Sequence, residues 1–177
     1  AVEVARRAGR PIVLAGKVDA HDLEHFVEAI EPHVDGDRVR VVGEVAGETK
    51  RALLAGADAL LFPIDWDEPF GLVMIESLAS GTPVVAFRRG SAPEIVEHGA
   101  TGFVVDDTEA MVGALRHLSI ISRRHCREVA EARFTIARMT DDYERHYARV
   151  AATGARTGDS GAGGDGRDQP EGTPIVR

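Results

Sequence analysis

The sequence lacks the features that mark a disulfide-stabilised, exported or membrane-spanning protein. Its 177 residues include a single cysteine, Cys126, so no disulfide can form within the chain, and a reducing, cytoplasmic setting is the simpler expectation. The longest apolar runs, such as ALLFPI and FGLVMI, are far shorter than the roughly 20 residues that a membrane helix needs. No charged and then apolar leader opens the sequence, so we expect a soluble protein that is not exported by a signal peptide.

Positive charge is also scarce. Lysine and arginine number 21 against 29 for aspartate and glutamate, which gives a formal net charge of -8. The acidic surplus is spread along the chain and forms no block. Binding to a nucleic acid backbone requires gathered positive charge, so nucleic acid is disfavoured as the main partner.

Short aliphatic runs dominate what the sequence does contain, and they predict β-strands at residues 11–16, 39–43, 59–63, 83–87 and 102–105. Four of the runs show hardly any polar alternation, which is typical of strands buried on both faces. Helical patterns fill the intervals between the runs, the first of them with Asp19 as the expected N-cap. This alternation predicts an α/β fold with a Rossmann-like, doubly wound parallel sheet.

The two ends of the sequence differ from its middle. AVEVARRAG, residues 1–9, predicts the end of a helix closed by Gly9, so the fold is expected to begin one element late, with its first strand missing. After Val105 the pattern is helical only. Residues 151–177 are rich in glycine, aspartate and serine and predict a disordered tail. We therefore expect one domain over residues 1–150, followed by this tail.

The segment DEPFGLVMIESLASGTPVVAF, residues 67–87, carries the strongest functional signal. A strand ends at Pro63, and a helix is predicted from about Phe70, with Pro69 in its first turn. The connection from a strand to the following helix lies at the carboxyl edge of a parallel sheet, where open α/β folds bind their ligands. The backbone N–H groups of Phe70, Gly71 and Leu72 therefore predict a site for a phosphate or a sugar hydroxyl.

Glu68 and Glu76 flank the start of this helix. Their expected separation is on the order of 10 Å, at a rise of about 1.5 Å per helical residue. A hydrolytic pair of carboxylates acting on one glycosidic bond lies about 5–9.5 Å apart. A clamp on two hydroxyl-bearing ends of one long ligand fits the spacing better. The alternative is that Glu76 belongs to the solvated face of an ordinary core helix.

EPFGLVMIESLASGTPVVAF, with RGSAPEIVEHGATGFVV after it, closely resembles the C-terminal, donor-binding domain of the retaining glycosyltransferase family 4. This is the glycosyl transferases group 1 family, which has the GT-B fold. The similarity covers about residues 12–147, and two glutamates with seven residues between them are the family's signature. VVGEV, followed by KRALLAGADALLFP, agrees with the preceding segment of the family.

The resemblance implies a reaction and a set of site residues. Family members transfer a sugar from a nucleotide sugar to an acceptor with retention of configuration, and they need no metal. By position, Glu68 would contact the sugar hydroxyls as the catalytic-site carboxylate, and the amides of Phe70, Gly71 and Leu72 would contact the sugar and the distal phosphate. Glu76 would accept hydrogen bonds from the ribose hydroxyls.

Two further places in the sequence belong to the same expected site. Gly43 and Val45, in the loop after the strand at 39–43, would lie near the base according to the resemblance. Lys17 follows the strand at 11–16, so it also stands at the carboxyl edge, where a cation could meet the diphosphate. An exposed loop lysine is the commoner explanation for Lys17.

The sequence also departs from the family pattern. The phosphate-binding Gly-Arg and Lys-Gly pairs and the N-terminal acceptor domain are missing, so we expect a donor-binding half that is inactive alone. One alternative is a nucleotide-sugar epimerase of the same fold, against which the two-glutamate segment speaks. The other is a non-catalytic, truncated module that binds a nucleotide without turnover.

Residues 88–94 carry two smaller patterns. Ser91 and Glu94 have the spacing of a capping box, which would satisfy the first N–H groups of a helix. Arg88 and Arg89 end the strand at 83–87, where either could contact phosphate, although a solvated loop is the favoured interpretation.

Overall fold

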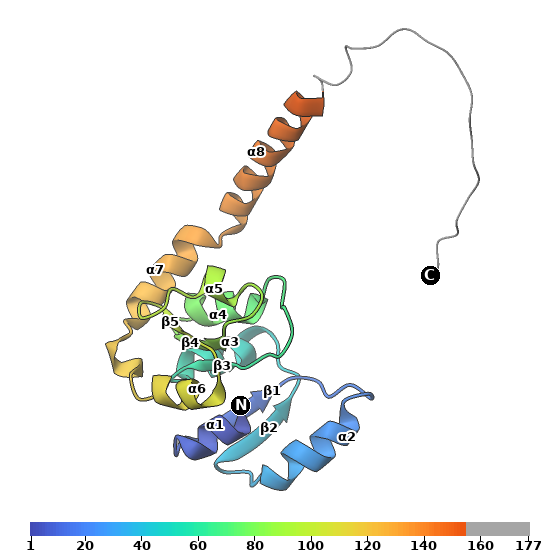
Figure 1. Ribbon diagram of the computed structural model, residues 1–177, viewed down its shortest axis with the longest axis vertical. Coiled ribbons are helices and arrows are strands. Elements are labelled where there is room, and N and C mark those ends of the chain that lie inside the picture. The colour runs from blue at the N-terminus through green and yellow to red at the C-terminus, as the bar shows by residue number, and fades with distance from the viewer. Residues whose placement is uncertain (155–177) are drawn as a thin grey trace, which may run out of the picture. The chain divides into compact units, whose positions relative to one another are not determined.

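The structure is a computed structural model that describes residues 1–154 and divides into two compact units. The first unit, Ala1–Thr135, holds all the strands of the described chain (Figure 1). In the second, which begins at Ile136, the described residues form one helix, α8 (Ile136–Gly154). This helix includes residues 151–154, which were predicted to belong to the disordered tail, and the rest of that predicted segment lies outside the described residues.

The strands of the first unit form two parallel sheets. In one, β1 (Ile12–Ala15) pairs with β2 (Val39–Gly43). In the other, β3 (Leu60–Phe62), β4 (Val84–Phe87) and β5 (Gly102–Val105) pair in that order. All the pairs are parallel, which confirms the predicted parallel α/β class, with the strands distributed over two sheets.

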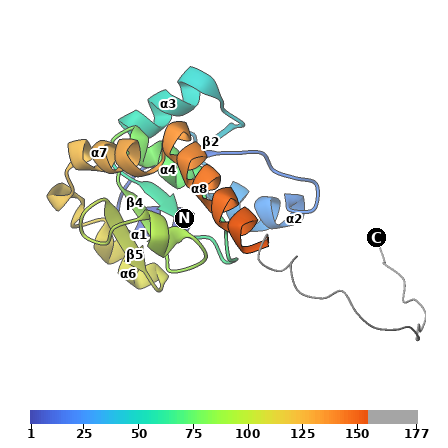
Figure 2. The same cartoon turned by 90° about the horizontal axis from the view of Figure 1, so that it is seen from above.

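Helices cover both faces of the three-stranded sheet. Helix α4 (Leu72–Ala79) contacts β3 and β4, and helix α6 (Thr108–Ala114) contacts β4 and β5. Figures 1 and 2 both place α4 and α6 on opposite sides of β4. The other α-helices of this unit are α1 (Val2–Arg7), α2 (Leu23–His25), α3 (Gly47–Gly56), α5 (Ala92–Ile95) and α7 (Arg123–Arg133), and a 3-10 helix spans Leu118–Ile120.

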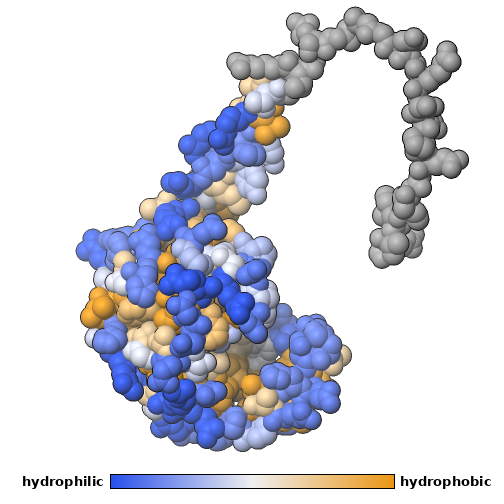
Figure 3. Space-filling view, viewed as in Figure 1, coloured by the Kyte–Doolittle hydropathy of each residue, from blue (hydrophilic) through white to orange (hydrophobic). Residues whose placement is uncertain are grey.

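The core of the first unit lies around β4. Val84, Val85 and Ala86 are fully buried, as are Met74 of α4 and Met111 of α6. An uninterrupted apolar run is the sequence that a strand needs when helices cover both of its faces. The face shown in Figure 3 is mainly hydrophilic on this unit, and hydrophobic side chains show through in smaller areas.

The segment after β1 differs from its prediction. Helix α2 begins at Leu23 and passes into a π-helical turn, Phe26–Ile30, and a 3-10 turn, Glu31–His33. The prediction that Asp19 caps this helix is wrong. Asp19 forms an ion pair with Lys17 instead, and Asp22 occupies the N-cap position.

The capping box predicted for Ser91 and Glu94 is also wrong. Ser91 precedes α5, but its side chain makes no capping hydrogen bond. The backbone of Ser91 is helical, at φ −74° and ψ −10°, whereas a capping residue normally has an extended backbone. The Ser91 hydroxyl is buried and has no hydrogen-bond partner within the described residues.

Helix α8 is amphipathic along its whole length. Exposed apolar residues recur on it every three or four positions, at Ile136, Met139, Tyr143, Tyr147 and Val150. No helix within residues 1–154 is both long and apolar enough to cross a membrane.

Arg123 ties the end of α3 to the turn before β4. Its guanidinium donates to the carbonyl oxygens of Ala55 and Ala57, at 2.6 and 2.7 Å, and to the Thr82 hydroxyl at 2.8 Å. The Thr82 hydroxyl in turn donates to the Leu54 carbonyl at 2.6 Å. One side chain thus satisfies carbonyl groups that the end of a helix leaves open.

We expect Arg123→Ala to lower the free energy of unfolding by about 1–3 kcal/mol, because the carbonyls of Ala55 and Ala57 and the Thr82 hydroxyl lose a charged donor. Arg124→Ala is the matched control, since Arg124 is exposed and pairs with Glu128 one turn along α7. It should change the free energy by no more than about 0.5 kcal/mol. Urea denaturation measures both, and equal effects would contradict the role given to Arg123.

Candidate functional site

The loop between β3 and α4 places the first glutamate at the start of a helix. Helix α4 begins at Leu72, and Gly71 is its N-cap, with a left-handed backbone at φ 70° and ψ 55°. Pro69 therefore lies before the helix, and the prediction that the helix starts near Phe70 is wrong. The left-handed turn at Gly71 breaks the helical path, and a methyl group there would lie 2.3 Å from Cε of the buried Met74.

Glu68 folds back onto this helix start. Its Oε1 accepts a hydrogen bond from the Gly71 N–H at 3.0 Å, and its Oε2 accepts one from Nε1 of Trp66 at 3.1 Å. The half-buried carboxylate therefore lies at the positive end of the α4 dipole, which stabilises negative charge. Within the described residues, Glu68 has no cationic partner.

The predicted amide donors divide into two groups. The Gly71 N–H is already bonded to Glu68. No acceptor for the N–H groups of Phe70 and Leu72 occurs among residues 1–154. Both of these residues expose their side chains, at 51% and 66%. The start of α4 thus offers free N–H donors beside a carboxylate, and this combination can bind a ligand that carries both phosphate and hydroxyl groups.

Gly90 holds the backbone of Glu68 in place. A Cβ atom on Gly90 would lie 2.3 Å from the Glu68 carbonyl oxygen and 2.5 Å from its nitrogen. The next residue, Ser91, donates its N–H to the same carbonyl at 2.9 Å. The turn after β4 therefore packs directly against the loop that carries Glu68. Gly90 was not predicted from the sequence, because a contact between separate loops leaves no local pattern.

Glu76 lies on the second turn of α4, about 7.5 Å along the helix axis from Gly71. Its Oε1 pairs with Nζ of Lys50, from the first turn of α3, at 2.5 Å. Both side chains are a little over one third exposed, at 38% and 37%. Glu76 is thus neither buried nor left to solvent. Lys50 is a second residue that the sequence analysis missed.

The remaining predicted site residues belong to the two-stranded sheet. Gly43 ends β2, and its carbonyl accepts a hydrogen bond from the Gly16 N–H at 2.9 Å, so the loop that carries Lys17 begins beside Gly43. The Lys17 ammonium pairs with Asp19. Val45 is half-buried in the loop that leads from β2 into α3, the helix that carries Lys50.

Other polar groups that the sequence analysis considered are engaged elsewhere. Arg88 pairs with Asp106 at 2.9 Å, and Arg89 pairs with Asp65 at 3.0 Å. Burial raises the pKa of the Cys126 thiol, which favours the unreactive form. Residues 1–154 contain no group of three or more histidine, cysteine or acidic side chains placed to hold a metal.

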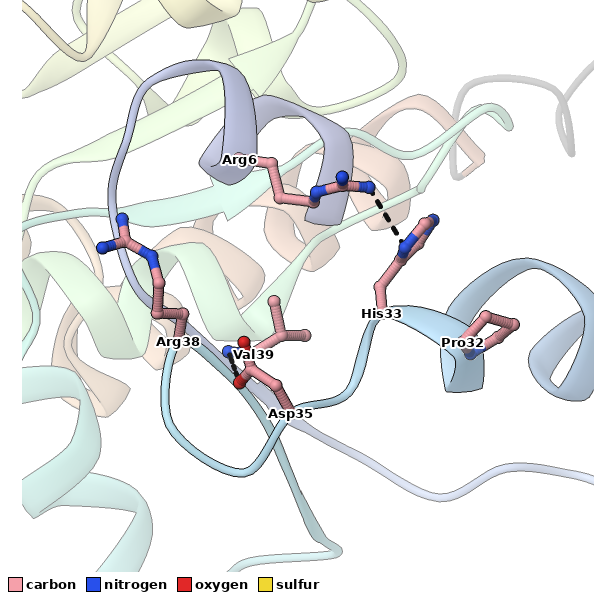
Figure 4. Close-up of a pocket in the computed structure, with 6 residues that line it drawn as sticks. All are labelled: Arg6, Pro32, His33, Asp35, Arg38 and Val39. Atoms are coloured by element: carbon pink, nitrogen blue, oxygen red, sulfur yellow. Dashed lines mark hydrogen bonds between the residues drawn. The ribbon is translucent and has the colours of Figure 1, made fainter.

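A hollow of about 480 Å³ lies by the segment that leads into β2, away from α4 in the sequence. It is lined by Arg6, Pro32, His33, Asp35, Arg38 and Val39 (Figure 4). Arg6 donates to Nδ1 of His33 at 3.1 Å, whereas the Arg38 guanidinium points away from that pair and donates to the Gly9 carbonyl. Backbone N–H bonds from Val39 and Asp37 lower the pKa of Asp35. The guanidinium groups of Arg6 and Arg38 therefore point in different directions and form no joint site for an anion.

Fold and geometry together define a class. A parallel α/β unit whose strand-to-helix crossing presents free amides and carboxylates belongs with the open α/β proteins that bind ligands at the carboxyl edge of the sheet. Within that class, the chain belongs to the glycosyl transferases group 1 family, whose model matches residues 2–119.

Individual relatives agree with this assignment. The chain is 28% identical over 152 residues to the phosphatidyl-myo-inositol mannosyltransferase of Mycobacterium leprae. The aligned region covers 82% of this chain and 39% of that protein. It is 37% identical over 95 residues to the D-inositol 3-phosphate glycosyltransferase of Corynebacterium diphtheriae, covering 54% and 22%. The chain thus spans well under half the length of these curated relatives.

Solved structures confirm the fold. AviGT4, a glycosyltransferase involved in avilamycin A biosynthesis, matches with a TM-score of 0.69 and 30% identity over 85% of this chain and 46% of its own. The C-terminal domain of the group 1 protein LpcC of Francisella tularensis matches with a TM-score of 0.62 at 18% identity, over 76% and 77%. The resemblance to the C-terminal half of a GT-B glycosyltransferase is therefore confirmed.

The contact between Gly90 and Glu68 can be tested by comparing two glycines. Gly90→Ala should lower the free energy of unfolding by more than Gly99→Ala. Both glycines have a positive φ, but a methyl group on Gly99 would meet nothing within 4 Å, whereas one on Gly90 would strike the Glu68 backbone. The positive φ alone should cost about 1–2 kcal/mol. Urea denaturation of both variants measures the difference, and equal losses would show that Gly90 does not constrain Glu68.

Proposed function

We propose that this chain is the donor-binding half of a retaining glycosyltransferase, which transfers a sugar from a nucleotide-diphosphate sugar to an acceptor. One observation carries the proposal: Glu68, in the loop before α4, and Glu76, on the second turn of α4, flank free backbone N–H groups at the start of that helix. Such a row of donors and acceptors suits one elongated ligand with a charged centre and hydroxyls at both ends. This is the chemical description of a nucleotide-diphosphate sugar.

At the sugar end, Glu68 accepts hydrogen bonds from the sugar hydroxyls and is the proposed catalytic-site carboxylate. The Phe70 and Leu72 amides donate to the distal phosphate. Charge develops on that phosphate as the sugar leaves, and donors fixed in advance stabilise such charge. Because the Gly71 N–H is bonded to Glu68, its role is to orient that carboxylate.

At the nucleotide end, Glu76 accepts hydrogen bonds from the ribose hydroxyls. A carboxylate has about four acceptor positions, so Lys50 leaves room for these bonds. Gly43 and Val45 lie near the base, at the start of the loop that continues into the helix of Lys50. Lys17 serves the diphosphate after exchanging its partner Asp19 for the ligand.

The amides and the dipole of α4 supply the positive potential that the leaving diphosphate needs, so the proposed reaction requires no metal. The acceptor is proposed to bind against a second domain, supplied by the rest of a protein of the relatives' length. The proposed location is the cytoplasm, which rests on the single cysteine of the sequence. The epimerase alternative is not favoured, because the matching family and its relatives are glycosyltransferases.

The nucleotide that the chain binds can be identified by testing a panel of nucleoside diphosphates. A solved structure of HepE from Anabaena in complex with UDP-glucose matches this chain with a TM-score of 0.69 at 22% identity, over 84% of this chain and 44% of its own, which shows the fold alone. Uridine diphosphate and its glucose conjugate are therefore the first ligands to test, followed by guanosine and adenosine diphosphates and their sugar conjugates.

Glu76→Ala should weaken binding of the nucleoside diphosphate about 10-fold or more, because two ribose hydroxyls lose a charged acceptor. Glu48→Ala is the control, since Glu48 is an exposed carboxylate on α3 that pairs with Arg51. It should leave the affinity unchanged. Isothermal calorimetry on folded variants measures both, and unchanged affinity in Glu76→Ala would contradict the ribose assignment.

The purified chain should bind a nucleotide sugar and transfer no sugar by itself. Incubation with labelled nucleotide sugar, with and without candidate acceptors, separates the possible activities. Measurable transfer by this chain alone would refute its role as half of an enzyme. An epimerised nucleotide sugar formed without an acceptor would overturn the glycosyltransferase proposal.

A further inference from the structure

Trp66 is the only tryptophan of the sequence and lies in the loop that carries Glu68. Its side chain is 60% exposed, yet its indole N–H donates to Oε2 of Glu68. Exposure of a large aromatic ring to water is unfavourable. Because the Trp66 ring is not packed in the core, core packing does not explain why a tryptophan stands here. Among residues 1–154, the polar contact of this side chain is with the Glu68 carboxylate before α4.

The two oxygens of Glu68 are held from different directions. The backbone N–H of Gly71 bonds to Oε1, and the indole N–H of Trp66 bonds to Oε2. Two contacts to the backbone of Glu68, from Gly90 and Ser91, fix the residue from the opposite loop. The carboxylate has about four acceptor positions, so two remain for a ligand.

Both groups that hold the Glu68 carboxylate are uncharged. Arg88 and Arg89, which precede Gly90 in the chain, pair with other acids, Arg89 with Asp65 and Arg88 with Asp106. A salt bridge would fix the carboxylate but would also neutralise part of its charge. Neutral N–H donors orient the group and leave it a strong acceptor for hydroxyl groups. Glu76 differs in this respect, because Lys50 pairs with it directly.

We propose that Trp66 is a positioning residue for the sugar end of the donor site: its indole N–H fixes Glu68 so that the two unused acceptor positions receive sugar hydroxyls. The proposal rests on the proposed function and adds a residue to it. Trp66 acts through Glu68 and makes no bond of its own to the sugar. It therefore contributes to recognition of the sugar and not of the nucleotide.

The test compares a nucleotide sugar with its nucleoside diphosphate in Trp66→Phe, which keeps an aromatic ring and removes the N–H. The first pair of probes is UDP-glucose and UDP. If the binding panel selects guanosine or adenosine diphosphate instead, the pair is GDP-mannose with GDP, or ADP-glucose with ADP. Calorimetry should show an affinity for the diphosphate within about 2-fold of wild type. The sugar conjugate should lose about 3- to 10-fold, less than the full effect of one hydrogen bond to a charged group, because Trp66 acts on the sugar only through Glu68.

A double-mutant cycle shows whether Trp66 acts through Glu68. In the Glu68→Ala background, Trp66→Phe should have no further effect on the affinity for the sugar conjugate. A persistent loss in that background would mean that the ring contacts the sugar directly and would overturn the positioning role. An equal loss for the diphosphate and the sugar conjugate would indicate a structural role and would also overturn it.

Ligand-free fluorescence tests the contact independently. Trp66 is the sole indole, so Glu68→Ala should change its emission, whereas Glu76→Ala should not. Unchanged emission in Glu68→Ala would show that the contact is not formed. If the chain binds nucleotides and Trp66→Phe behaves as wild type, only the inference about Trp66 fails. If the chain binds no member of the panel, the proposed function fails, and this inference fails with it.

Discussion

The candidate site depends on one interaction, the hydrogen bond from the Gly71 N–H to the Glu68 carboxylate at the start of α4. It closes the loop between β3 and α4, and it requires the left-handed backbone that Gly71 adopts. The bond consumes one helix-terminal donor and leaves the donors of Phe70 and Leu72 free. The same contact therefore sets the direction of the helix, the place of the carboxylate and the number of N–H groups left for a ligand.

The two glutamates are held by different chemistry, which suits their different proposed roles. Glu76 shares a half-exposed ion pair with Lys50, and exposed pairs of this kind contribute about 0–1 kcal/mol. Rearrangement there on nucleotide binding costs little. Glu68 is held by uncharged N–H donors and by backbone packing from Gly90, which fix its orientation without an ion pair. In the proposed function, the end of the ligand where bonds break faces Glu68, the carboxylate that uncharged donors hold.

The sequence predicted those parts of the fold that depend on short-range patterns. The strand at 39–43 was predicted to the residue, because its three valines favour a strand and Gly43 ends the run. The start of α4 was misplaced, because Pro69 is a common first-turn residue and nothing local reports the left-handed turn at Gly71. Ser91 had the spacing of a capping residue but lacks the backbone conformation that capping needs.

The residues missed by the sequence analysis share one property: their contacts join separate segments or depend on side-chain orientation. Lys50 meets Glu76 across 26 positions of the chain, and Gly90 meets Glu68 across two loops. Trp66 is close to Glu68 in sequence, but only the structure gives the direction of its N–H. The family motif located the site, and the tertiary contacts gave the state of each group in it.

The central claim is that one nucleotide sugar lies along the start of α4, between Glu68 and Glu76. Backbone amide NMR during titration with the nucleotide sugar tests it most directly. The account predicts that the largest shifts occur at the amides of Phe70 and Leu72, with smaller shifts at Gly43 and Val45. Shifts confined to other parts of the chain, such as the hollow lined by Arg6 and His33, would contradict it.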